Sequence, residues 1–272
     1  MAEQDPYLKI QGAHSGVVQV FSDVFVVSGK MNMGPMQIAR NMQIVRERRQ
    51  LCIINSVRVS EDVLKEIEAL GTVKHVIKNG AHGVDDAFYV ERYGAALWSV
   101  PTAKWNPKFG KKGIKMERNL LEDVPFKCMT AVRFDDETRA AGPSADCREG
   151  SSVNVVVKTD KGGVLLSNDM VQNYEPHDDA EKISEHTLNG GFTDFMSRML
   201  GFSGRVITPW MFMQNYAPGR DPKQLKHEIE KVLSHDWQHL VPCHGVLALN
   251  TAKQEWISSL EKWYGKDWYV QE

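Results

Sequence analysis

Short runs of apolar residues, separated by polar turn residues, dominate the first fifth of the chain. They occupy residues 17–21, 24–27, 41–45 and 51–54. Runs of this kind, rich in Val, Ile and Phe and bounded by polar residues, are typical of β-strands. We therefore predict an antiparallel meander at the start of the fold.

A helical period replaces this pattern after residue 60. Ser60 is a typical N-cap residue, Gly71 is a typical residue after a helix end, and the segment between them has one apolar face. The residues of that face are Val63, Leu64, Ile67 and Leu70. A strand over 73–77, a short helix over 85–92 and a strand over 95–98 follow. Strands that alternate with helices pair in parallel, so we expect a parallel portion of the sheet here.

The second half of the chain repeats this style. The predicted elements are strands over 126–134, 153–157 and 164–167, a hairpin turn at 160–163, a helix from 221, a strand over 239–242 and a helix over about 251–263. The whole predicts an α/β fold with two mixed β-sheets and helices outside. We expect one domain over residues 1–272, built of two halves of about 1–118 and 119–272.

Composition and charge narrow the class of protein. Lys and Arg number 33 and Asp and Glu 35, a net charge of −2, which argues against a nucleic-acid binder held by bulk positive charge. No apolar run is long enough to span a membrane, and the polar N-terminus does not resemble a signal peptide. The four cysteines are widely spaced, which favours free thiols in a reducing compartment. We therefore expect a cytoplasmic protein with no nucleic-acid or membrane partner, and a homodimer is an open alternative.

Residues that could bind a metal ion or act in catalysis follow the ends of three predicted strands. His82, with Asp85 and Asp86 three and four residues on, follows the first of these strands; Asp169 and His244 follow the other two. Each has a plain structural alternative: an ordinary loop residue for His82, a helix cap for Asp85 or Asp86, a turn cap for Asp169, and a hydrogen-bonded loop residue for His244. Ligand sites collect at strand ends, and imidazole and carboxylate together suit Zn²⁺, Fe or Mn²⁺.

These segments resemble those of the metallo-β-lactamase-fold superfamily. Gly162 to Asp169 is similar to the strand that leads into its metal-bridging aspartate, and Val241-Pro242-Cys243-His244-Gly245 is similar to its terminal His-Gly ligand turn. Asn79-Gly80-Ala81-His82 resembles the corresponding segment of a divergent, poorly characterised branch. The resemblance covers nearly the whole chain and implies a four-layer αββα sandwich.

The chain departs from the superfamily's H-x-H-x-D-H motif. With His82 in the first position, Val84 stands at the second His, Asp86 at the Asp and Ala87 at the last His, so two ligands are missing. The loop that carries the family's next His has none here, and Cys147 near that place is a candidate thiolate ligand. The resemblance thus implies at most one metal ion.

We accordingly predict a metal-dependent hydrolase whose small-molecule substrate is a small ester, lactone or thioester, with water activated by a single metal ion. The predicted metal ligands are His82, Asp86, Asp169 and His244, with Asp85 or Asp86 as the group that orients or deprotonates the water. The expected cofactor is one zinc ion, with iron, manganese and a metal-free site as open alternatives. A degenerate, non-catalytic protein that binds a small molecule or a protein partner, and a non-hydrolytic iron enzyme, are the competing functions.

Overall fold

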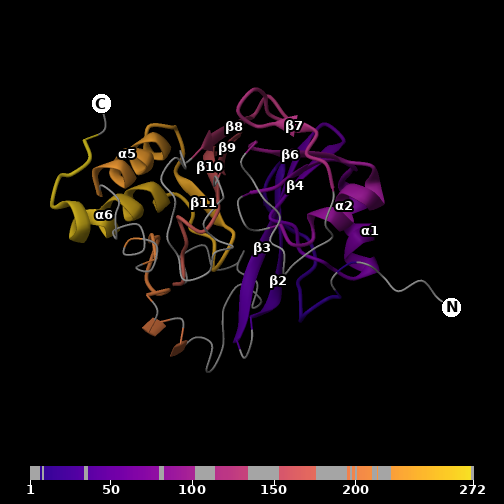
Figure 1. Cartoon of the computed structure of the whole chain (residues 1–272), viewed down its shortest axis with the longest axis horizontal. Helices are drawn as coiled ribbons and strands as arrows, with labels where there is room; N and C mark the ends of the chain where they lie inside the picture. The colour runs from indigo at the N-terminus through magenta and orange to yellow at the C-terminus, as the bar shows by residue number, and fades with distance from the viewer. Residues whose placement is uncertain are drawn as a thin grey trace.

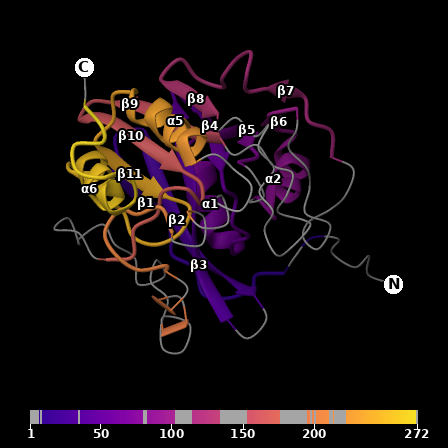
Figure 2. The same ribbon diagram turned by 60° about the vertical axis from the view of Figure 1, so that its left-hand side comes forward.

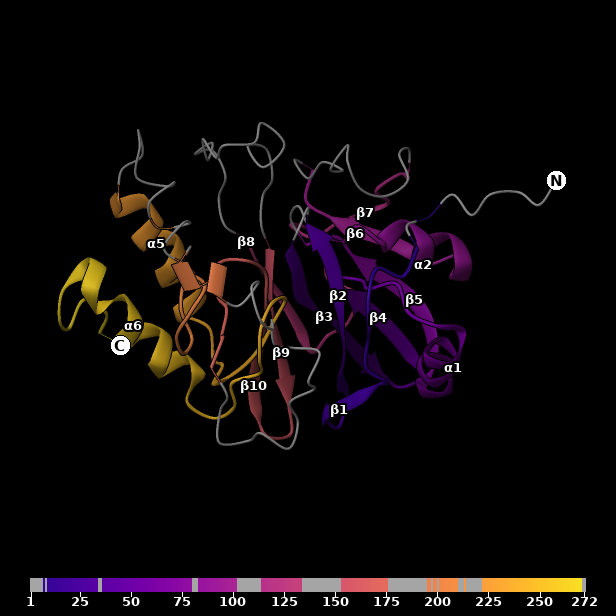
Figure 3. The ribbon, with the colours of Figure 1, turned by 90° about the horizontal axis from the view of Figure 1, so that it is seen from below.

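Two β-sheets pack face to face and carry helices on their outer faces (Figures 1 and 3). The structure is a computed structural model, and it describes residues 7, 9–33, 36–79, 83–101, 114–133, 153–175, 195–196, 198–199, 201–209, 213 and 222–270. Helices α1 (Glu61–Leu70) and α2 (Asp86–Tyr93) cover one sheet, and α5 (Pro222–Leu233) and α6 (Ala252–Tyr264) cover the other. This confirms the predicted α/β class and the four-layer αββα sandwich.

The first sheet has seven strands in chain order. They are β1 (Val18–Phe21), β2 (Val24–Met33), β3 (Met36–Glu47), β4 (Gln50–Ile54), β5 (Thr72–Ile77), β6 (Ala96–Ser99) and β7 (Arg118–Asn119). Strands β1 to β4 pair antiparallel, and β4 to β7 pair in parallel. Both halves of the predicted pattern, the meander and the parallel portion, are confirmed.

The second sheet has four strands in the order β11-β10-β9-β8. They are β8 (Met129–Arg133), β9 (Val153–Thr159), β10 (Gly162–Ser167) and β11 (His239–Pro242). The hairpin between β9 and β10 lies where it was predicted, whereas β8 begins three residues after the predicted start at Phe126 because a turn bonds the Met129 N–H to the Phe126 carbonyl. Strands β10 and β11 pair in parallel, and this pairing positions the candidate site.

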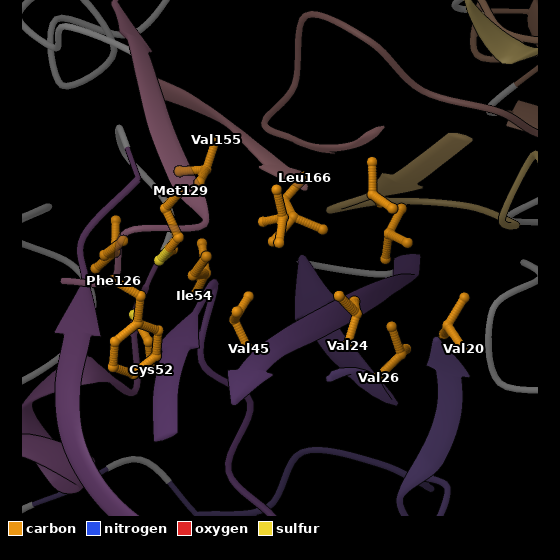
Figure 4. Packing of buried hydrophobic residues seen from close by; sticks show 14 of the residues in the cluster. Val20, Val24, Val26, Val45, Cys52, Ile54, Phe126, Met129, Val155 and Leu166 are labelled. Carbon is orange, nitrogen blue, oxygen red and sulfur yellow. The ribbon is translucent and has the colours of Figure 1, made fainter. Parts of the chain in front are cut away.

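The main core lies between the sheets (Figure 4). Alternate residues of the first sheet, such as Val24, Val26 and Val45, face Val155 and Leu166 of the second, and all five are buried. The period of two along a strand puts such residues on one face, so burial of that face fixes the pairing register.

The helices begin and end close to the predicted residues. Helix α1 begins after Ser60 and ends before Gly71, and its residues Val63, Leu64 and Ile67 are buried against the first sheet. The Ser60 side chain makes no capping hydrogen bond, so the apolar face contributes more to this helix than its cap. Among the described residues, no helix has both the length and the apolarity needed to cross a membrane.

A long hairpin of β2 and β3 extends past the shorter strands beside it (Figure 2). Ten residues of β2 and twelve of β3 form it, whereas β4 has five. The middle of β3 therefore lies against the loop that follows β11 in the other sheet, and the Asn41 N–H donates to the Cys243 carbonyl across 2.7 Å.

Candidate metal centre

The strand register brings Asp169 and His244 to one place. Strands β10 and β11 pair in parallel with Ser167 opposite Pro242. Asp169 and His244 each lie two residues beyond this last pair, so both leave the same edge of the sheet. The sequence prediction was that both residues share a metal ion with His82, which lies outside the described residues.

Three potential ligand atoms meet at this edge. The His244 Nε2 lies 3.3 Å from Asp169 Oδ1, and the Cys243 thiol donates to the same oxygen across 3.6 Å. The ligand atoms of these three residues all lie within 4.8 Å of one another. Burial raises the pKa of the Cys243 thiol well above its usual value, and the nearby Asp169 carboxylate raises this pKa further.

The second nitrogen of His244 shows that the site suits a cation. Nδ1 lies 2.7 Å from the Ala39 carbonyl oxygen, which only accepts, so Nδ1 carries a proton. In the neutral ring, Nε2 then presents a lone pair to the Asp169 carboxylate, which also only accepts. A proton or a metal ion between Nε2 and the carboxylate removes the repulsion between these two acceptors. An anchored Nδ1–H is also the usual outer contact of a metal-binding histidine.

Two of the three separations between the ligand atoms fit a tetrahedral metal ion, and the third is within 4.8 Å. Oxygen and nitrogen ligands about 2.0–2.1 Å from such an ion lie about 3.3 Å apart, and a sulfur at about 2.3 Å lies about 3.5 Å from that oxygen. The observed values of 3.3 Å and 3.6 Å match both separations. The residues present therefore fit one zinc-like ion.

A chain of side chains behind Asp169 fixes its orientation. The buried Gln172 Nε2 donates to Asp169 Oδ1 across 3.1 Å and to the Asp169 carbonyl across 2.9 Å. The Tyr174 hydroxyl in turn donates to Gln172 Oε1. Since both ends of the Gln172 amide are bonded, Asp169 has little freedom to turn away from His244.

Strand β3 holds the turn that carries His244. The buried Asn41 Nδ2 donates to the carbonyls of Pro242 and Gly245 across 2.9 and 2.8 Å. Gln43, two residues along the same face, donates to the Val241 carbonyl across 2.8 Å. Amide side chains of one sheet therefore set the position of a loop in the other.

Asp85 and Asp86 do not belong to this cluster in the structure. Asp85 is buried, pairs with the Arg40 guanidinium, and accepts the Arg58 backbone N–H across 3.0 Å. It occupies the N-cap position of α2, yet its side chain makes no capping hydrogen bond. Its carboxylate thus connects α2 to strand β3.

Asp86 is fully buried at the start of α2. Its Oδ1 accepts the Ser56 hydroxyl, and within the described part of the chain Oδ2 has no hydrogen-bond partner. Burial raises the pKa of Asp86 to about 7, although Lys78 and the Ser56 hydrogen bond lower it. Burial likewise lowers the pKa of Lys78, against the opposing effect of Asp86.

This raised pKa predicts a stability change with pH. Folded Asp86 retains its proton up to about pH 7, whereas the unfolded group releases it near 3.8. Stability is therefore highest below the unfolded pKa and falls as pH rises through the folded pKa. The side chain of Asp86→Asn does not titrate. Between the unfolded pKa near 3.8 and the folded pKa of about 7, we therefore expect its unfolding free energy to rise relative to that of wild type by up to about 4 kcal/mol. Urea unfolding at several pH values measures this change.

The exposed Asp123 offers a control for this experiment. Asp123→Asn is expected to follow the wild-type pH profile of unfolding free energy. Parallel profiles for Asp86→Asn and wild type would contradict the raised pKa.

Two of the residues proposed from sequence lie outside the described residues. They are the metal ligand His82 and the candidate thiolate Cys147. Among the described residues, Asp169, Cys243 and His244 form the one group of potential ligands close enough to hold a metal ion. Of the four predicted ligands, the structure brings together Asp169 and His244, and it places Asp86 beside Ser56.

Sequence reasoning missed three residues of the site. The sequence predicts only a free thiol at Cys243, although the place of this residue directly before His244 at a strand end is a usable signal. Asn41 acts through contacts that no local pattern predicts, because its partners lie 201 or more residues away along the chain. Gln172 lies only three residues after Asp169, but no sequence pattern marks its amide as the partner of that carboxylate.

Comparison with solved structures identifies the fold. The chain is similar to the metallo-beta-lactamase FIM-1 from Pseudomonas aeruginosa in its mono-zinc form, with 12% identity, a TM-score of 0.54, and coverage of 93% of this chain and 97% of that one. It is also similar to a metallo-beta-lactamase from Pontibacter korlensis, with 14% identity, a TM-score of 0.54, and coverage of 90% and 98%.

The chain therefore has the metallo-β-lactamase fold, as the sequence resemblance implied. No protein-family model matches the sequence. A search of curated proteins gives no significant match either. The likeness thus lies in the three-dimensional arrangement of the elements.

Proposed function

We propose that this protein is a metal-dependent hydrolase of a small ester, lactone or thioester, with one metal ion held by Asp169 and His244. The observation that carries the proposal is the contact of His244 with both Asp169 and the Ala39 carbonyl. The mono-zinc form of the similar FIM-1 enzyme supports a single ion in this fold.

The protein's own residues would prepare this site. When bound, the ion supplies Lewis-acid polarisation of a carbonyl and activation of water. Ala39 keeps the His244 ring turned so that Nε2 faces the site. Gln172 holds the Asp169 carboxylate, and Asn41 holds the turn that carries His244. A positioned ligand set costs no reorganisation when substrate binds, which is the usual advantage of a rigid site.

Asp85 and Asp86 have a different part in this proposal from the one expected from sequence. Arg40 pairs with Asp85, and Ser56 donates to the buried Asp86. These contacts favour a structural role at the start of α2 over service as a base or a ligand.

Metal content and hydrolysis test the proposal together. Protein purified without chelator is expected to carry about one equivalent of a transition metal, and His244→Ala is expected to lose most of it. Hydrolysis of a panel of esters, lactones and thioesters should stop on chelation and return with zinc. Exposed His227 on α5 gives the matched control, since His227→Ala should retain metal and activity.

Two results would overturn the proposal. One is a metal content below about 0.2 equivalents with no gain on reconstitution. The other is hydrolysis that chelation does not change.

The buried Asp85–Arg40 pair also favours a second candidate function. Asp85, one of the two aspartates that follow His82, is paired with the guanidinium cation of Arg40. An aspartate paired in this way suits a protein that keeps the fold, holds no metal ion, and binds a small molecule or a protein partner. Absence of metal together with full cellular function of a His244→Ala protein would support this candidate.

A further inference from the structure

We infer that Cys243 is a third ligand of the same metal ion and supplies a thiolate. The inference rests on the proposed metal site at Asp169 and His244, and it adds the chemical class of the ion. Such a site has one carboxylate, one thiolate and one imidazole.

The turn after β11 directs two neighbouring side chains to one carboxylate oxygen. The Cys243 Sγ lies 3.6 Å from Asp169 Oδ1, and the His244 Nε2 lies 3.3 Å from it. Neighbouring residues of an extended strand point to opposite faces, so this convergence needs a turn. Gly245, with a φ of 88°, and the hydrogen bond from Asn41 N–H to the Cys243 carbonyl create that turn.

The surroundings of Cys243 differ from those of a cysteine that fills a core. Cys52 is buried between the sheets among apolar residues. Cys243 is only 1% exposed, yet among the described residues it belongs to none of the three apolar clusters. Its sulfur instead faces a carboxylate and an imidazole, which are metal-ligand groups.

A thiolate ligand determines which metal ions bind tightly. Soft sulfur ligands favour zinc and cadmium over manganese and magnesium, which prefer oxygen. Binding would form a metal–sulfur bond and release the thiol proton to solvent. One thiolate and one carboxylate together balance the charge of a divalent ion. We therefore expect zinc to bind in the presence of excess manganese.

X-ray absorption of the zinc-loaded protein tests this directly. We expect one sulfur at about 2.3 Å and nitrogen or oxygen ligands at about 2.0–2.1 Å. The sulfur should persist in Cys128→Ser and in Cys147→Ser and be absent from Cys243→Ser. Zinc affinity of Cys243→Ser, measured by competition with a chelating dye, should fall at least about tenfold.

The possible outcomes separate the two proposals. Zinc without sulfur in the wild-type protein, or a sulfur lost in Cys147→Ser and kept in Cys243→Ser, overturns the thiolate ligand even if the protein is a hydrolase. Zinc with sulfur but no hydrolysis of any substrate supports the ligand and overturns the function. Failure of the wild-type protein to bind zinc overturns both. Spectra of wild type and Cys147→Ser decide the matter if Cys243→Ser does not fold.

Discussion

Replacing Gly245 by Ala is expected to destabilise the protein by at least about 3 kcal/mol and to displace His244 from Asp169. An added Cβ at this position would lie 1.9 Å from the Asn173 carbonyl oxygen, which is backbone and cannot swing aside. The residue also has a φ of +88°, which L side chains rarely adopt. Urea unfolding measures the loss of stability, and zinc titration measures the loss of the proposed metal site.

Gly265 provides a closely matched control. Its φ is +91°, and nothing lies within 4 Å of a Cβ added there. Gly265→Ala should therefore cost only the backbone strain, about 1–3 kcal/mol, and leave binding at the proposed zinc site unchanged. Equal destabilisation of the two variants would show that the close approach of Gly245 and Asn173 does not exist.

Asn41→Asp is the second change for which we expect a large loss of stability. The Asn41 Nδ2 donates to two carbonyls, and its Oδ1 accepts the Ser28 hydroxyl across 2.8 Å. Aspartate has nearly the same shape but would place a buried carboxylate oxygen against both carbonyls. A buried, unpaired charge and two lost hydrogen bonds should cost at least about 3 kcal/mol at neutral pH.

The pH dependence of this variant provides a further check. A protonated aspartate donates one hydrogen bond, so Asn41→Asp should recover part of its unfolding free energy in acid. Ser28→Ala keeps both carbonyl contacts but removes the donor to the buried Oδ1, so it should cost about 1–2 kcal/mol. If Asn41→Asp unfolds at the same urea concentration as Ser28→Ala, the two carbonyl contacts do not hold the turn.

The elements of the fold could be predicted because their signals are local. The apolar face of Val63, Leu64 and Ile67 predicts α1 from a few neighbouring residues, and the same residues are buried in the structure. Gly162 and Gly163 likewise mark the start of β10. The strand predicted from Phe126 was less accurate at its start, because a turn bond between Phe126 and Met129 cannot be inferred from hydrophobicity.

The candidate site could be predicted only in part. Asp169 and His244 each follow an apolar strand, so the sequence alone indicates them as residues at the edge of a sheet. Asp85 and Asp86 have an equally suggestive place, yet Arg40 on β3 and Ser56 after β4 bind them. Whether a carboxylate faces other potential ligands or a protein cation depends on which distant element packs beside it.

By itself the sequence determined which segments form strands and helices and which residues stand at strand ends, since these depend on spacing along the chain. Only the tertiary structure decided that Cys243 joins Asp169 and His244, and that Asn41 holds their turn. The reason is physical: Asp169 and His244 are brought together by the pairing of β10 with β11, and Asn41 reaches them from the other sheet. Such contacts depend on strand register and sheet packing, which no local stretch of sequence encodes.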